Sequence, residues 1–145
     1  MTRKLFIATA AAAALIGLGS LPASANSVWL DQYGFGNQAG GAQSGTGNAI
    51  GVFQNGVFNG AISQQHGHGN TAAIGQQGFN NHADSYQQGN HNQGGVAQFG
   101  ANHNSILVQD GNGNIAAGVQ VGNGCDASVA QTGGGNVAAF VQTCP

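Results

Sequence analysis

An eleven-residue repeat runs through this sequence from residue 26 to its end, and it constrains the fold more than any other feature. Glutamine recurs at every eleventh residue without a gap, glycine follows each glutamine by two residues, and asparagine precedes most of them by six. Eleven units follow one another with no insertion or deletion. Each unit should therefore be one copy of the same structural element.

The unit is numbered here from its asparagine, which places glutamine at position 7 and glycine at position 9. His103 and Cys125 replace the asparagine in two units, and Cys144 replaces the glycine in the last. The glutamines are Gln32, Gln43, Gln54, Gln65, Gln76, Gln87, Gln98, Gln109, Gln120, Gln131 and Gln142. The glycines are Gly34, Gly45, Gly56, Gly67, Gly78, Gly89, Gly100, Gly111, Gly122 and Gly133. The asparagines are Asn26, Asn37, Asn48, Asn59, Asn70, Asn81, Asn92, Asn114 and Asn136.

The residue types of the unit favour a strand followed by a turn. The segment from asparagine to glutamine has a usual strand length. The four residues after glutamine are rich in glycine and asparagine, which adopt the positive φ of tight turns. An eleven-residue period also fits a right-handed helical supercoil, but a glycine in every unit disfavours a helix. We expect one strand and one four-residue turn per unit.

Alternation along such a strand places the odd positions of the unit on one face. These positions hold asparagine, a small residue, often an aliphatic residue such as Val52 or Ile74, and glutamine. Burying amides is costly unless they are paired, and identical amides stacked in ladders can pair with one another. The pattern predicts an all-β fold, a two-sheet parallel β-solenoid (cross-β) with 11-residue strand-turn units, 22 residues per rung and about 5.5 rungs.

The first residues have the pattern of a signal peptide. Arg3 and Lys4 precede an apolar stretch over residues 5–18, and Ala-Ser-Ala at 23–25 fits a cleavage site. The apolar stretch is shorter than the about 20 residues of a membrane-spanning helix. We expect residues 1–25 to be a cleaved signal peptide and residues 26–145 to be the repeat domain.

Cleavage would remove every cation of the chain. Without Arg3 and Lys4 the net charge falls from −2 to −4. A chain without Lys or Arg is not expected to bind nucleic acid through its phosphates, to dock on anionic lipid or to insert into a membrane once mature. The four acidic residues are interpreted as gatekeepers against premature aggregation. They are Asp31, Asp84, Asp110 and Asp126.

The remaining polar residues give no indication of catalysis. The chain has no glutamate, its aspartates do not pair, and serine and histidine share no common phase of the repeat. His66 and His68 lie close in sequence, but no histidine recurs at a 22-residue spacing. We therefore expect no enzyme activity, no metal site and no cofactor.

The two cysteines occupy related places in the last two units. Cys125 opens one strand, Cys144 lies two residues beyond the glutamine of the next, and both are at odd positions. In a rung those two ends lie close together and both side chains face inward. An exported protein meets an oxidising environment, so we expect a disulfide that closes the last rung. Two free buried thiols are the alternative.

The motif Gln-x-Gly-x-x-Asn-x-Ala-x-x-x-Gln resembles the curlin repeat, and it is found in residues 32–43, 65–76 and 76–87. The resemblance covers residues 26–142. It implies a subunit of bacterial amyloid fimbriae that is exported to the periplasm, passes through an outer-membrane pore and polymerises at the cell surface. Such fibres serve biofilm matrix formation and adhesion. Its partners would be further copies of itself, another curlin-type subunit and the secretion pore.

Two other functions are considered. A minor curlin subunit would nucleate fibres of another subunit. A soluble solenoid could instead be a binding module of adhesin or ice-binding type, but an ice-binding face needs ladders of threonine, and the repeat's threonines share no column. The first unit begins at the expected cleavage site without a polar cap. Because solenoids without caps expose open strand edges, the sequence favours self-assembly by end-to-end stacking of rungs.

Overall fold

The computed structural model describes residues 25–145, and the predicted signal peptide lies outside this range except for its last residue. Eleven strands follow one another in the described part, ten of nine residues and a last one of seven. They are β1 (Ser27–Phe35), β2 (Gln38–Thr46), β3 (Ala49–Val57), β4 (Gly60–His68), β5 (Thr71–Phe79), β6 (His82–Asn90), β7 (Gln93–Ala101), β8 (Asn104–Asn112), β9 (Ile115–Asn123), β10 (Asp126–Gly134) and β11 (Val137–Thr143).

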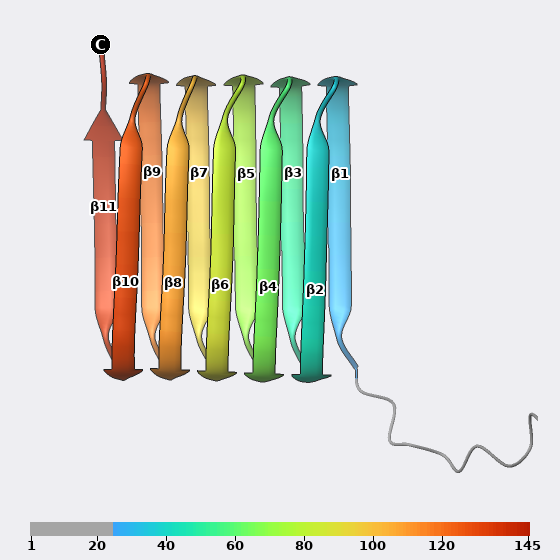
Figure 1. Ribbon diagram of the computed structural model, residues 1–145, viewed down its shortest axis with the longest axis vertical. Coiled ribbons are helices and arrows are strands. Elements are labelled where there is room, and N and C mark those ends of the chain that lie inside the picture. The colour runs from blue at the N-terminus through green and yellow to red at the C-terminus, as the bar shows by residue number, and fades with distance from the viewer. Residues whose placement is uncertain (1–24) are drawn as a thin grey trace, which may run out of the picture.

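The strands alternate between two parallel sheets. The six odd-numbered strands form sheet A and the five even-numbered strands form sheet B, each in sequence order. Partner residues are 22 residues apart, as in Ser27 opposite Ala49. Figure 1 shows the even strands in front of the odd ones, with the rungs advancing from β1 to β11. The predicted two-sheet parallel β-solenoid is therefore confirmed, with five and a half rungs.

The predicted four-residue turn is wrong. Each full strand runs from position 2 to position 10 of its unit, so that only position 11 and the next position 1 lie outside strands. The glycine at position 9 has φ between 101° and 138°, yet it remains paired, as Gly34 does with Gly56. A second positive φ, between 54° and 72°, follows at position 11. The chain bends at positions 9 and 11, but the pairing between neighbouring strands continues across position 9.

The position 9 glycines are required by close backbone contact as well as by φ. A Cβ atom built on Gly78 would lie 1.9 Å from the carbonyl oxygen of Gly100 in the next rung. The same distance, 1.9 or 2.0 Å, recurs at every position 9 glycine that has a rung after it. Position 11 is less restricted, and it accommodates Phe58 and His91 at positive φ.

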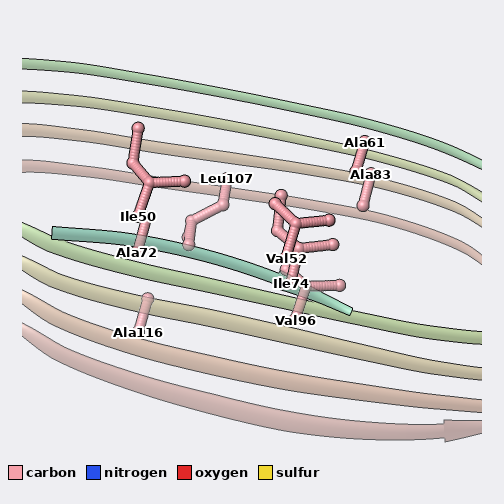
Figure 2. Packing of buried hydrophobic residues seen from close by; sticks show 9 residues of the cluster. All are labelled: Ile50, Val52, Ala61, Ala72, Ile74, Ala83, Val96, Leu107 and Ala116. Atoms are coloured by element: carbon pink, nitrogen blue, oxygen red, sulfur yellow. The ribbon is translucent and has the colours of Figure 1, made fainter. Parts of the chain in front are cut away.

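The core is a thin layer between the sheets. Figure 2 shows Ile50, Val52 and Ile74 pointing from sheet A toward sheet B, while Ala61 and Leu107 come from the opposite sheet. Positions 3, 5 and 7 of the central strands are buried, the position 9 glycine is half-buried, and the even positions are at least partly exposed. This alternation follows the sequence pattern and places the polar asparagine and glutamine columns at the two margins of the apolar layer.

Candidate functional site

Two glutamine ladders run the length of the rod, one on the inner face of each sheet. In both, the Nε2 of a glutamine donates to the Oε1 of the glutamine one rung later, at distances of 2.6 to 3.0 Å. Between Gln54 and Gln120 every ladder side chain is at most 1 % exposed. The direction of donation is the same in every rung, so both ladders point from the N-terminal to the C-terminal end of the rod.

Each buried glutamine also satisfies its second amide hydrogen. Gln76 donates to the Oε1 of Gln98 and to the main-chain oxygen of Gly60, both at 2.8 Å, and its own oxygen accepts from Gln54 at 2.7 Å. The acceptor Gly60 lies in sheet B, so this bond joins the two sheets. A buried amide without partners would cost about 1–3 kcal/mol. The ladder removes that cost at every interior rung.

The asparagines hold the corners of the rod in the same way. Asn48 donates its Nδ2 hydrogens to the carbonyl oxygens of Ser44 and Gly67, at 3.2 and 2.9 Å. Its Oδ1 accepts from the main-chain nitrogen of Asn70 at 3.0 Å. The side chain thus ties its own turn both to the strand before it and to a strand 19 residues later. The bond to the carbonyl 19 residues later and the bond from the next rung's main-chain nitrogen recur with the repeat, whereas the bond to the carbonyl four residues earlier is made only in some units.

His103 reproduces two of the bonds of the asparagine it replaces, the one to the carbonyl four residues earlier and the one from the next rung's main-chain nitrogen. The imidazole is 1 % exposed, and its Nδ1 accepts from the main-chain nitrogen of Cys125 at 3.1 Å. Because that nitrogen is a donor, Nε2 must carry the ring proton, and it lies 3.1 Å from the carbonyl oxygen of Phe99. The histidine therefore serves as a structural substitute, as its position in the repeat indicates.

The predicted disulfide between Cys125 and Cys144 is present, with Cα atoms 5.6 Å apart. It joins position 1 of one unit to position 9 of the next, 19 residues later. Asn48 and Gly67 stand in the same relation and share a hydrogen bond. A covalent bond therefore takes the place of the regular corner hydrogen bond in the last rung.

The two ends of the rod carry complementary unpaired groups. At the N-terminal end, no donor within residues 25–145 reaches the side-chain oxygens of Gln32 and Gln43. At the C-terminal end, Gln131 and Gln142 each donate one amide hydrogen to a main-chain oxygen, and in the same stretch the other has no acceptor. One end thus offers acceptors and the other donors, in the same two columns.

Apolar interior positions are also open at the N-terminal end. Val28 and Leu30 are 52 % and 46 % exposed, whereas Ile50 and Val52, the equivalent residues of the next rung in sheet A, are 2 % and 0 % exposed. The difference arises because no residue of the described range 25–145 covers β1 on its free side. Buried apolar area stabilises at roughly 25 cal/mol per Å², so this end gains from a rung placed on it.

The outer faces of the two sheets differ, a feature that the eleven-residue consensus does not predict. Sheet A has a shallow apolar groove along position 4, where Trp29 is followed by glycines and alanines. Sheet B carries Asp84, Asp110 and Asp126, and His82 lies 3.2 Å from Asp84. Reading the sequence at a period of 22 would have revealed the difference, because only that period separates the two sheets.

The remaining acidic residues and histidines are dispersed over the described range. The expected gatekeepers all lie on outer faces of strands, Asp31 on sheet A and the other three on sheet B. Within residues 25–145 no group of three or more histidine, cysteine or acidic residues could hold a metal ion. No helix of this part is long and apolar enough to cross a membrane. Ser63 and Ser85 are buried in sheet B, and their hydroxyls have no partner among the described residues.

No protein-family model matches the chain, and no curated protein matches it either.

Proposed function

We propose that this protein is the structural subunit of an extracellular, curli-like amyloid fibre that assembles by end-to-end stacking of solenoid rungs and serves biofilm matrix formation and adhesion. The observation that carries the proposal is the complementarity of the rod ends. Unfilled oxygens of Gln32 and Gln43 at one end match unused amide hydrogens of Gln131 and Gln142 at the other. The repeat's resemblance to curlin and its signal-peptide pattern support export and assembly at the cell surface.

Stacking is favourable because it repeats contacts that the rod already makes internally. An added copy extends both parallel sheets, covers Val28 and Leu30, and continues both amide ladders. Open strand edges without bulges or inward-pointing charges are templates for such pairing. A strongly charged chain would resist dense packing through self-repulsion, and the repeat region contains only four formal charges at neutral pH.

Thioflavin T fluorescence of the purified chain from Asn26 onward, followed by fibre diffraction, tests the proposal. We expect spontaneous fibres with a meridional reflection at about 4.7–4.8 Å, and faster growth when preformed fibres are added. A chain that remains monomeric, β-rich and soluble at high concentration would overturn the proposal and favour a soluble binding rod.

A matched pair of variants tests the role of the rod end. Val28→Lys places a charge on the interior side of the edge strand, where stacking would bury it without a partner. Trp29→Lys places the same charge one residue away on the outer face, where it remains solvated. Fibre growth should be slowed strongly by the first substitution and little by the second. Equal growth rates would argue against stacking through this end.

A minor, nucleating subunit is the second candidate, and the disulfide favours it. Cys125 and Cys144 interrupt the asparagine and glycine columns only in the last two units. A chain specialised to present one fixed end to another subunit would need such a difference between its ends. Seeding distinguishes the two functions. A major subunit elongates its own fibres, whereas a nucleator accelerates a second curlin-type subunit and elongates poorly by itself.

A further inference from the structure

Resting on the proposed function, we infer that successive copies in the fibre are rotated by half a turn about its axis, so that the two different outer faces of the rod alternate along each side. The inference follows from the odd number of units. Sheet A has six strands and sheet B has five. The last strand, β11, therefore lies in sheet A, and the next place in the solenoid lies in sheet B, on the free edge of β10.

A copy that fills this place puts its β1 on β10 and its β2 on β11. Since β1 belongs to sheet A of its own molecule, the copy must be rotated by half a turn to lie in line with sheet B. The rotation also reverses the direction of β1, which makes it parallel to β10. A copy added without rotation would place β1 on β11 and leave the edge of β10 uncovered, one strand short.

The glutamine ladders favour the rotated copy. In that arrangement Gln131 faces the next copy's Gln32, and Gln142 faces the next copy's Gln43, so both columns continue. Without rotation, Gln142 meets Gln32 and the amide hydrogen of Gln131 stays unpaired inside the fibre. An unpaired buried donor opposes association, and it would recur at every junction between copies.

Side-chain sizes at the junction agree with the same arrangement. The ring of Phe140 lies over Gly118, where a built Cβ would be 2.1 Å from it. In the rotated stack the next copy's Gly41 lies on the other side of Phe140, so the ring is placed between two glycines. Without rotation the next copy's Leu30 would fall on Phe140, and over-filling an interior is destabilising.

One corner of the junction departs from the repeat. Cys144 takes position 9, where every preceding unit has glycine with a positive φ, and Cys144 is not among the residues with positive φ. The next copy's Gly45 would meet this corner in the rotated stack. Without rotation the next copy's Gly34 would meet it, so the disulfide does not favour one arrangement over the other.

The rotation has a consequence for the fibre surface. The apolar groove of sheet A in one copy is continued by the outer face of sheet B in the next, which carries Asp84, Asp110 and Asp126. Neither face is continuous over more than one molecule. Side-by-side packing of fibres through the apolar groove is thereby limited to patches one molecule long.

Tyrosine cross-linking distinguishes the arrangements. Tyr33 is exposed at position 8 of β1. In the rotated stack it lies beside Thr132 of the preceding copy, and without rotation it lies beside Thr143. Both threonines are at exposed outer positions, so that Thr132→Tyr and Thr143→Tyr form a matched pair. Within one molecule neither position is near Tyr33, because both lie at the other end of the rod.

Fibres of each variant, assembled from a mixture of ¹⁵N-labelled and unlabelled chains, are photo-oxidised, and dityrosine peptides are identified by mass spectrometry. We expect intermolecular cross-links from Tyr33 to the introduced tyrosine in Thr132→Tyr, at least tenfold more abundant than in Thr143→Tyr. The reverse ratio, or equal yields, would overturn the rotation while leaving the fibre proposal intact. If the unmodified chain forms no fibres, the proposed function fails and the rotation fails with it.

The unmodified chain gives an independent measurement. Rotated copies repeat every eleven rungs, about 53 Å at the cross-β spacing, whereas unrotated copies with a one-strand gap repeat every six rungs, about 29 Å. The axial repeat in electron micrographs separates the two values. A repeat of the shorter length would overturn the inference even if both tyrosine variants failed to assemble.

Discussion

Replacing Gly78 by alanine tests the tight backbone approach on which the solenoid depends. This glycine has φ of 131°, a conformation that costs a residue with a side chain about 1–3 kcal/mol. The added Cβ would lie 1.9 Å from the carbonyl oxygen of Gly100, so β5 and β7 must separate at this corner. Two hydrogen bonds cross the corner there, from Asn81 Nδ2 to Gly100 O and from the nitrogen of Asn102 to Phe79 O.

Losing those two bonds costs about 1 kcal/mol each, so the total destabilisation is about 3–5 kcal/mol. Gly75→Ala in the same strand is the matched control. Gly75 has open space within 4 Å of a built Cβ and no positive φ. Removing its flexibility in the unfolded chain should stabilise the protein by about 0.4–1 kcal/mol.

Urea unfolding of the monomer, followed by circular dichroism at low protein concentration, measures both variants. The unfolding midpoint should fall sharply for Gly78→Ala and remain or rise for Gly75→Ala, with m unchanged in both. Equal midpoints for the two variants, or a cost below about 1 kcal/mol for Gly78→Ala, would refute the argument that close backbone contact fixes this column.

Three further outcomes are expected. Gln76→Ala should lower the free energy of unfolding by about 3 kcal/mol or more, because three hydrogen bonds involve that side chain. Gln77→Ala on the outer face should change the free energy of unfolding by less than about 0.5 kcal/mol, and the urea midpoints of the two variants measure the difference. His103→Asn should leave the midpoint unchanged or raised because the amide restores the repeat, while His103→Leu removes the acceptor of the Cys125 nitrogen and should cost about 1–3 kcal/mol. Reducing the bond between Cys125 and Cys144 should destabilise the last unit by about 3 kcal/mol, given its 19-residue separation, and hydrogen exchange should show the loss of protection in β11 and not in β5.

The repeat predicts most of this fold because its fixed spacing determines which residues pair between neighbouring strands. Equal spacing of Gln32, Gln54 and Gln76 requires that identical residues meet in successive rungs, and parallel pairing at 22 residues follows. The disulfide follows from the same register, since position 1 and the next unit's position 9 meet at one corner. Neither inference needs any knowledge of individual packing contacts.

The strand ends could not be predicted from residue types. Glycine after a glutamine is typical of a turn, yet Gly56 and its equivalents stay within the ladder at positive φ. They do so because the residues above and below adopt the same φ, so that the bend itself is repeated in every rung. Single-residue propensity describes an isolated chain, and here the neighbouring rungs decide the conformation.

The difference between the outer faces was hidden for another reason. At even positions the eleven-residue unit has no consensus, so averaging over all units mixes Ala73 of sheet A with Asp84 of sheet B. The apolar groove becomes visible only when odd and even units are separated. Odd and even units can be separated in this way only if two sheets are already expected. The consensus positions by themselves predict those two sheets.

The polarity of the ladders and the place of the disulfide together give the two ends different roles. The donor end, with Gln131 and Gln142, is the end that Cys125 and Cys144 lock covalently. The acceptor end has no such link, and its interior residue Val28 is half exposed. Ordering a mobile segment on binding opposes association, and a pre-ordered surface reduces that cost. In a fibre of stacked copies the locked end is therefore suited to act as the template on which β1 and β2 of the incoming copy dock.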